Sequence, residues 1–172
     1  NRQRIQSAFR RYQQKTYDVM TKILMVCLGN ICRSPLAEGI LKSKISSSEV
    51  LVDSAGTGAW HSGELPDKRS IAVAKKYGID LTDQRARLFL VEDFHRFDKI
   101  YVMDKSNYVN VCKLAPSADL IDKVELILNE SHPEKDLEVP DPYYGGENGF
   151  ENVYQMLDEA CTKIKEKIKN AS

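Results

Sequence analysis

Residues 22–38 read KILMVCLGNICRSPLAE, and this stretch constrains the fold more than any other part of the chain. The run Lys22–Cys27 is apolar and partly β-branched, without the spacing of a helical stripe, so it predicts a buried strand. A short turn follows, and Pro35 stands where the first turn of a helix accepts proline, directly after a possible cap, Ser34. The stretch therefore predicts a strand, a tight loop and a helix in immediate succession.

The loop between this strand and helix has the composition of an anion site. Backbone N–H groups ahead of a helix N-terminus point into one concavity, where Gly29 permits close backbone approach and Asn30 tolerates positive φ. Such a cradle stabilises the thiolate of a cysteine that faces it. The planar guanidinium of Arg33 fits two oxygens of a phosphate. We therefore expect Cys27 to be a nucleophilic thiolate beside a site for a tetrahedral oxyanion.

The string CLGNICRSP, in which Arg33 follows Cys27 after five intervening residues, resembles the signature of the low-molecular-weight protein tyrosine phosphatases. The resemblance covers most of the chain, from residue 20 to residue 170. It implies hydrolysis of phosphotyrosine in proteins, and of small aryl phosphates, through a phosphocysteine and without a metal or other cofactor. Further segments resemble the same family: DSAGT at 53–57, GIDL at 78–81, YVMDKSN at 101–107 and DPYYGG at 141–146.

Composition limits the partners and the compartment. The 25 basic and 25 acidic residues balance, which argues against general nucleic-acid binding. No apolar run approaches the roughly 18 residues of a membrane span, and no signal peptide is visible. The four cysteines, at 27, 32, 112 and 161, do not form a secreted disulfide framework in a chain of this length. We expect a cytoplasmic protein whose partners are phosphotyrosine-containing proteins.

We expect the chain to divide into an extension at 1–19 and one phosphatase domain at 20–172, a length that suits a single domain. The extension is interpreted as a tag or linker. The alternative is a basic amphipathic helix for a partner or a membrane surface, because Ile5, Ala8, Phe9 and Tyr12 follow helical spacing.

Strand and helix patterns alternate along the domain, which predicts a three-layer α/β fold with a parallel sheet covered on both faces. The family resemblance implies a four-stranded, flavodoxin-like sheet of order 2-1-3-4. Ligands of such sheets bind beyond the carboxyl ends of the strands, where Cys27 and Asp104 fall. The expected strands are 22–27, 50–53, 99–103 and 124–128, and the expected helices are 35–47, 67–77, 91–96, 107–113 and 147 or 149 to 169.

The resemblance assigns the loop residues to phosphate binding. Ser34 is expected both to cap the helix and to donate a hydrogen bond to the thiolate. Cys32 is expected to protect the nucleophile from irreversible oxidation by forming a disulfide with it. The expected phosphate-binding set is Leu28, Gly29, Asn30, Ile31, Cys32, Arg33 and Ser34.

Asp141 is the candidate general acid. Tyrosinate is a poor leaving group at neutral pH, so a positioned carboxylic acid should protonate it. Pro140 and Pro142 stiffen the backbone on either side of Asp141. An Asp-Pro pair alone is ordinary turn chemistry, and it is the resemblance that favours the catalytic role. Tyr143, Tyr144 and Trp60 are expected to line the substrate cleft.

Two residues are expected to support the site. Asp104 should orient Arg33, or else cap the following helix. Gln84 stands where many bacterial relatives have a histidine that hydrogen-bonds with the loop's Ser and Asn, and its amide should allow the same network with a different pH dependence. His61, His95 and His132 are expected at the surface, and no His or Cys spacing indicates a metal site.

Three alternatives share parts of this pattern. An arsenate reductase needs two further cysteines close together, whereas Cys112 and Cys161 are far apart in the sequence. A protein-arginine phosphatase resembles this chain but has threonine in the place of Ile31. A silent phosphotyrosine-binding module would lack the nucleophile or the acid, and both are present.

Overall fold

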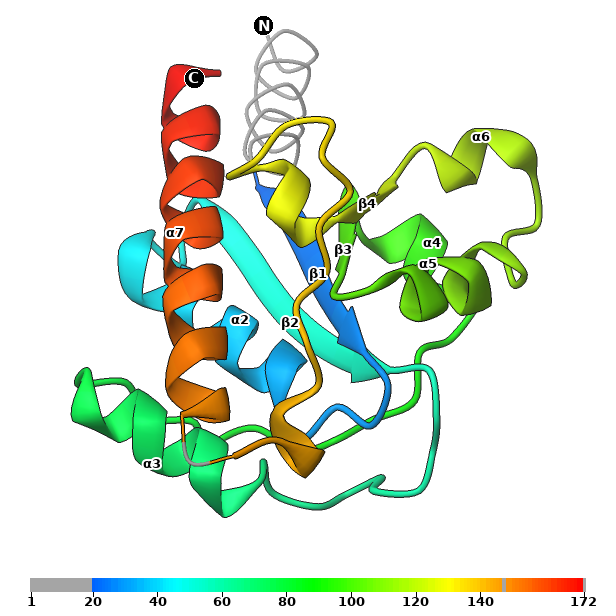
Figure 1. Ribbon diagram of the computed structural model, residues 1–172. Coiled ribbons are helices and arrows are strands. Elements are labelled where there is room, and N and C mark those ends of the chain that lie inside the picture. The colour runs from blue at the N-terminus through cyan, green and yellow to red at the C-terminus, as the bar shows by residue number, and fades with distance from the viewer. Residues whose placement is uncertain (1–19, 147, 172) are drawn as a thin grey trace, which may run out of the picture.

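The computed structural model describes residues 20–146 and 148–171 of the 172-residue chain, so the extension expected at 1–19 lies outside the described residues. The elements alternate between strand and helix, as predicted (Figure 1). In chain order they are β1 (Thr21–Cys27), α2 (Arg33–Lys44), β2 (Val50–Gly56), α3 (Lys68–Lys76), α4 (Asp93–Arg96), β3 (Lys99–Val102), α5 (Lys105–Cys112), α6 (Ala118–Ile121), β4 (Val124–Leu126), the 3₁₀ turns η1 (Ile127–Asn129) and η2 (Pro142–Tyr144), and α7 (Gly149–Asn170).

The four strands form one parallel sheet of order β2-β1-β3-β4, which confirms the predicted topology. In the register of the two neighbouring strands, Cys27 of β1 lies opposite Gly56 of β2. The central strand is buried from Ile23 to Cys27, as the continuous apolar run requires. The nucleophile candidate therefore sits at the carboxyl end of the central strand.

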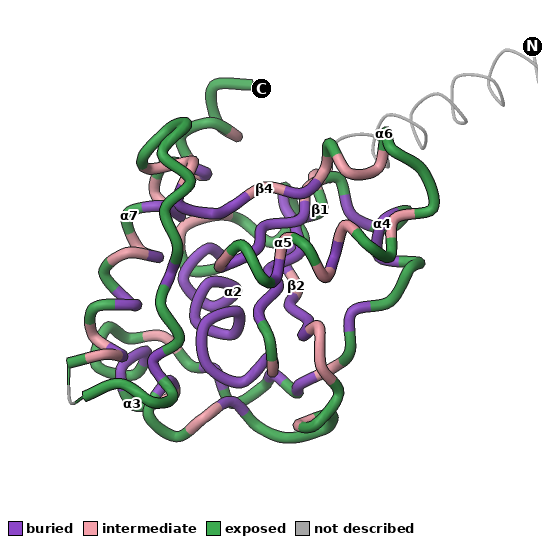
Figure 2. Tube along the Cα trace, turned by 45° about the vertical axis from the view of Figure 1, so that its right-hand side comes forward, coloured by how far each residue is buried: buried purple, intermediate pink, exposed green. Residues whose placement is uncertain are grey.

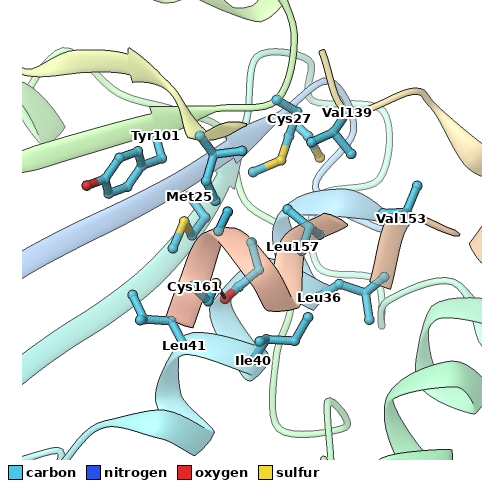
Figure 3. Close-up of a cluster of buried hydrophobic side chains, with 14 of the residues drawn as sticks. Met25, Cys27, Leu36, Ile40, Leu41, Tyr101, Val139, Val153, Leu157 and Cys161 are labelled. Carbon is cyan, nitrogen blue, oxygen red and sulfur yellow. Dashed lines mark hydrogen bonds between the residues drawn. The ribbon is translucent and has the colours of Figure 1, made fainter. Parts of the chain in front are cut away.

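Helices cover both faces of the sheet. One apolar core lies between the sheet and α2, α3 and α7, and a second lies between the sheet and the α4–α5 side (Figure 1). Figure 2 shows that α2 is buried over most of its length, because the sheet and α7 cover it from two directions. Figure 3 shows this first core, with Leu36 and Ile40 of α2 facing Val153 and Leu157 of α7.

The bounds of several elements differ from the sequence prediction, and β2 for example continues to Gly56 where the prediction ended at residue 53. Helix α2 begins at Arg33, so Ser34 lies inside its first turn, and no side chain caps that helix. Strand β4 ends at Leu126, because the chain turns into η1 over residues expected as strand. Helix α6 was not predicted, since none of its residues is buried and it therefore carries no apolar stripe.

The segment after η1 brings the acid candidate to the carboxyl edge of the sheet. It runs from Glu130 past the carboxyl ends of the strands to η2, which Asp141 caps (Figure 1). The backbone N–H of Val139 donates to the carbonyl of Met103, just beyond β3, at 2.8 Å. Among the helices that the structure describes, none is both long and apolar enough to span a membrane.

Candidate active site

Asn30 holds the loop between β1 and α2 in a concave shape. Its φ of 56° lies in the left-handed region. The side-chain Nδ2 donates to the hydroxyls of Ser34 at 2.8 Å and Ser54 at 3.0 Å, and Oδ1 accepts from the backbone N–H of Arg87 at 3.0 Å. These three bonds offset the cost of the backbone conformation and fix the loop to β2 and to the segment before α4.

Cys27 lies beneath this loop with only 2% of its surface exposed. Its Sγ is 2.9 Å from the hydroxyl of Ser34. Because Ser34 also accepts from Asn30, its own proton is directed to the sulfur. The predicted contact between Ser34 and the nucleophile candidate is present, whereas the predicted helix cap is wrong.

Gly56 allows the loop to lie close against β2. A Cβ at this position would come within 2.7 Å of the Leu28 carbonyl oxygen and 3.1 Å of the Asn30 backbone nitrogen. Any side chain would therefore push the loop away from the strand. The glycine in DSAGT thus lets the candidate phosphate-binding loop pack directly on β2.

The guanidinium of Arg33 is 3% exposed and lies between two carboxylates. Its NH1 donates to Asp104 Oδ2 at 2.6 Å and to the carbonyl of Val139 at 3.0 Å, and its NH2 is 3.8 Å from Asp141 Oδ2. Asp104 also caps α5 through a reciprocal capping box with Asn107. Asp104 therefore both contacts Arg33 and caps the following helix, the two alternatives that the sequence offered for it.

Asp141 faces the loop from the opposite side of the cleft. One carboxylate oxygen accepts from the backbone N–H of Tyr143 at 3.0 Å, and the other points towards Arg33. The carboxylate is partly exposed, so it remains accessible to a molecule in the cleft. Sequence-distant residues 27, 33 and 141 thus converge on one site.

These residues line a cleft of about 320 Å³. Aromatic side chains form its rim: Trp60, Tyr143 and Tyr144 are 71%, 41% and 89% exposed, and the two tyrosine rings meet edge to face. The imidazole of His61, which we had expected only at the surface, also lines the cleft and packs against Gly29. Its position next to Trp60 in the sequence was the signal that could have revealed it.

Cys32 lies in the same cleft and is buried. Burial, followed by the negative charges of Asp67, Cys27 and Asp141, raises the pKa of Cys32 to about 12. The loop therefore contains two thiols with different surroundings, and Cys32 stays protonated at neutral pH.

Gln84 does not join the loop network. Its Nε2 donates to the carbonyl of Pro35 at 3.1 Å, and its buried Oε1 has no partner among the described residues. The hydrogen bonds predicted from Gln84 to Ser34 and Asn30 are absent. The side-chain Nδ2 of Asn30 donates to the hydroxyl of Ser54 instead. Gln84 thus supports the start of α2 and not the loop directly.

Sequence reasoning missed the continuation of this network. The Ser54 hydroxyl donates to Glu38 Oε1 at 2.7 Å, and Lys42 donates to Glu38 Oε2 at 2.6 Å. Burial raises the pKa of Glu38, while its hydrogen bonds from Lys42 and Ser54 act in the opposite direction. Glutamate one turn after the loop reads as a surface helix residue, so only the three-dimensional packing reveals its place.

The comparisons with known proteins agree with this geometry. Residues 22–172 match the family model described as low molecular weight phosphotyrosine protein phosphatase. The chain belongs to this family. Its members are protein-tyrosine phosphatases, which are hydrolases. A low molecular weight phosphotyrosine protein phosphatase of Schizosaccharomyces pombe is 43% identical over 155 residues, which cover 85% of this chain and 98% of the yeast protein.

Solved structures with the same fold superpose closely on this chain. A protein tyrosine phosphatase from Entamoeba histolytica gives a TM-score of 0.82 at 37% identity, covering 88% of this chain and 98% of that one. Vibrio vulnificus Wzb, solved in complex with benzylphosphonate, gives a TM-score of 0.76 at 31% identity, covering 86% and 98%. The fold and the family are therefore established independently of the site geometry.

The described part of the chain contains no group of three or more His, Cys, Asp or Glu side chains arranged to hold a metal ion. Cys112 and Cys161 belong to different cores, on opposite faces of the sheet. They are not adjacent to each other, and neither lines the cleft.

Proposed function

We propose that this protein hydrolyses phosphotyrosine in proteins, and small aryl phosphates, through a phosphocysteine formed on Cys27. The observation that carries the proposal is the convergence of a sulfur, a buried guanidinium and a carboxylate in one aromatic-rimmed cleft. The nucleophile, the anion-binding group and the acid are the three groups that metal-free phosphoryl transfer from a phenol requires.

In the first step the Cys27 thiolate attacks phosphorus, and the S–P bond forms as the bond to the phenolic oxygen breaks. The backbone N–H groups of residues 28–33 and the guanidinium of Arg33 bind the equatorial oxygens, where negative charge is spread in the transition state. Asp141, in its protonated form, transfers its proton to the leaving oxygen. The phenol then leaves, and the phosphoryl group stays on sulfur.

In the second step Asp141, now a carboxylate, accepts a proton from a water molecule that attacks the phosphocysteine. The S–P bond breaks, inorganic phosphate is released, and Cys27 returns as a thiolate. The hydroxyl of Ser34, 2.9 Å from the sulfur, stabilises that thiolate by donating a hydrogen bond. The cycle needs no co-reactant other than water.

The rim of the cleft favours a flat aromatic substrate. Trp60 and the two tyrosines provide faces on which a phenyl ring stacks, and Ile31 adds an apolar surface inside the cleft. The Vibrio relative carries benzylphosphonate, which combines an aromatic ring with a phosphate-like group. The same features favour phosphotyrosine over phosphoarginine as the substrate of this chain.

Cys32 is proposed as the partner of an oxidised nucleophile. If peroxide converts Cys27 to a sulfenic acid, the Cys32 thiol can displace water from it to form a disulfide, which thiols later reduce. This protective role, like the thiolate itself, suits a reducing compartment, and we propose the cytoplasm.

Hydrolysis of p-nitrophenyl phosphate in the presence of a metal chelator tests the proposal. We expect turnover by the wild type, none by Cys27→Ser, and unchanged turnover by Cys112→Ser, whose thiol lies on the other face of the sheet. Inactive wild-type protein would favour a phosphotyrosine-binding module. Full activity in Cys27→Ser would reject Cys27 as the nucleophile. Reduction of arsenate that consumes thiols, in place of phosphate ester hydrolysis, would favour the arsenate reductase.

A further inference from the structure

We infer that Arg69 is a positioning residue that holds the segment carrying Asp141 against the loop carrying Cys27. The inference rests on the proposed role of Asp141 as the general acid. Arg69 is the second residue of α3, and none of the sequence patterns singled it out. Its contacts join two segments that are more than 70 residues apart in the chain.

One side of the Arg69 guanidinium is bound to Asp67. The Nε and NH2 groups donate to Asp67 Oδ1 and Oδ2, both at 3.0 Å, in a two-point arrangement that fixes the plane of the guanidinium. Asp67 also caps α3 by accepting from the backbone N–H of Arg69 at 2.8 Å. The hydrogen bond with Arg69 is the main reason that the pKa of Asp67 is lowered, so both partners are charged at neutral pH.

The start of α3 is in turn bonded to the phosphate loop. The backbone N–H of Asp67 donates to the carbonyl of Ile31 at 2.8 Å. The buried hydroxyl of Ser70 donates to the carbonyl of Cys32 at 3.1 Å. The carboxylate that orients Arg69 is therefore fixed relative to the loop that binds phosphate.

The other side of the guanidinium reaches the acid segment. NH1 donates to the carbonyl of Tyr143 at 3.2 Å, while the N–H of the same residue donates to the carboxylate of Asp141 at 3.0 Å. The guanidinium carbon also lies 5.2 Å from the ring centroid of Tyr143 and 4.6 Å from that of Phe150, at the start of α7. Both distances fall within the range of cation–π attraction.

This arrangement points to positioning rather than to substrate binding or stability. Three of the five guanidinium N–H groups already donate to protein groups, and Arg69 does not line the cleft that holds Cys27 and Arg33. The side chain is about half exposed, and exposed ion pairs contribute little to folding. Displacing a catalytic group by about 1 Å, in contrast, can cost up to a hundredfold in rate.

The test compares Arg69→Met and Arg69→Lys with Asp141→Ala on two substrates, and reads kcat/KM. A phosphotyrosine peptide has a poor leaving group and needs the acid, whereas p-nitrophenyl phosphate needs it less. We expect Arg69→Met to lower kcat/KM by about tenfold on the peptide and less than about threefold on p-nitrophenyl phosphate. On the peptide, kcat/KM of Arg69→Lys should lie between those of the wild type and Arg69→Met, because one ammonium cannot hold both Asp67 and the Tyr143 carbonyl.

Lys68→Met is the matched control. Lys68 is the exposed neighbour of Arg69 in α3, and its side chain makes no hydrogen bond or ion pair with the residues that the structure describes. We expect it to behave as wild type on both substrates. Combined with Asp141→Ala, Arg69→Met should cause no further loss, because the group that it positions is already gone.

The outcomes separate the two claims. A leaving-group-dependent loss in Asp141→Ala, together with equal losses on both substrates in Arg69→Met, overturns the inference about Arg69 alone. An additive loss in the double variant does the same. Equal losses on both substrates in Asp141→Ala overturn the acid role and the inference together. If Arg69→Met does not fold, the same comparison with Arg69→Lys decides.

Discussion

Arg33 donates from NH1 to the backbone carbonyl of Val139 at 3.0 Å, and Val139 precedes Asp141 by two residues. The guanidinium proposed to bind phosphate therefore also fixes the segment that leads to the proposed acid. The same nitrogen is held by Asp104, whereas NH2 lies 3.8 Å from Asp141, and Arg33 lines the cleft. The proposed anion binding and the placement of the proposed acid thus depend on one side chain.

Arg33→Lys should lower kcat/KM for p-nitrophenyl phosphate by about a hundredfold or more. A lysine keeps the charge, but its ammonium cannot contact Asp104, Val139 and two phosphate oxygens together. The inhibition constant of inorganic phosphate should rise in the same variant, because the product uses the same fork. Near-normal catalysis and phosphate affinity in Arg33→Lys would mean that the guanidinium is a structural ion pair.

Asp104→Asn separates the two contacts of this residue. Asparagine caps helices as well as aspartate, so α5 should remain intact and the midpoint of thermal unfolding should change little. The buried guanidinium of Arg33 loses its charged partner, and we expect kcat/KM to fall by about tenfold. Asp104→Ala should add a loss of stability of about 1 kcal/mol from the missing cap. An Asp104→Asn enzyme with wild-type kinetics would restrict Asp104 to capping.

The sequence predicts the sheet and the phosphate loop because both depend on local patterns. The buried run before Cys27, the glycine and asparagine of the loop, and the proline of α2 each act within a few residues. The resemblance adds Asp141, which by local chemistry alone is a turn residue. Arg69 and Glu38 were missed because their partners lie far away in the sequence. Gln84 was placed wrongly because Ser54 of β2 makes the bond to Asn30 that was expected from Gln84.

Asn30 offers a test of the loop itself. Asn30→Gly keeps access to positive φ but removes the bonds to Ser34, Ser54 and Arg87, whereas Asn30→Ala removes the bonds and strains the backbone. We expect both variants to lose activity. The free energy of unfolding should fall by about 1–3 kcal/mol in Asn30→Gly and further in Asn30→Ala. Equal stability of the two variants in urea unfolding would show that the φ of residue 30 is not a source of strain.

The two thiols of the loop should differ in reactivity. Because the pKa of Cys32 is raised to about 12, this thiol should resist iodoacetamide at neutral pH in the folded protein, while Cys27 reacts. In urea both should react. Peptide mapping after a brief exposure measures the ratio. Rapid alkylation of Cys32 in folded protein would contradict the burial and the charges that surround it.

The raised pKa of Cys32 also predicts that the folded protein loses stability at alkaline pH. A folded-state pKa above the ordinary value of 9.0 means that the folded protein retains a proton that the unfolded chain releases. This contribution is fully present below the unfolded pKa and is lost as the pH rises through the folded pKa. The stability of the wild type relative to Cys32→Ser should therefore be constant up to about pH 9 and decline from there towards pH 12. A stability advantage of the wild type over Cys32→Ser that grows with pH would contradict the raised pKa.

The most direct test is to locate the phosphoryl group during turnover. The wild type is mixed with p-nitrophenyl phosphate, quenched in acid after the initial burst of nitrophenolate, and digested for mass spectrometry. We predict one phosphoryl group, on the sulfur of Cys27, and neither burst nor label in Cys27→Ser. A phosphoryl group on any other side chain, or a burst that persists in Cys27→Ser, would contradict the proposed mechanism.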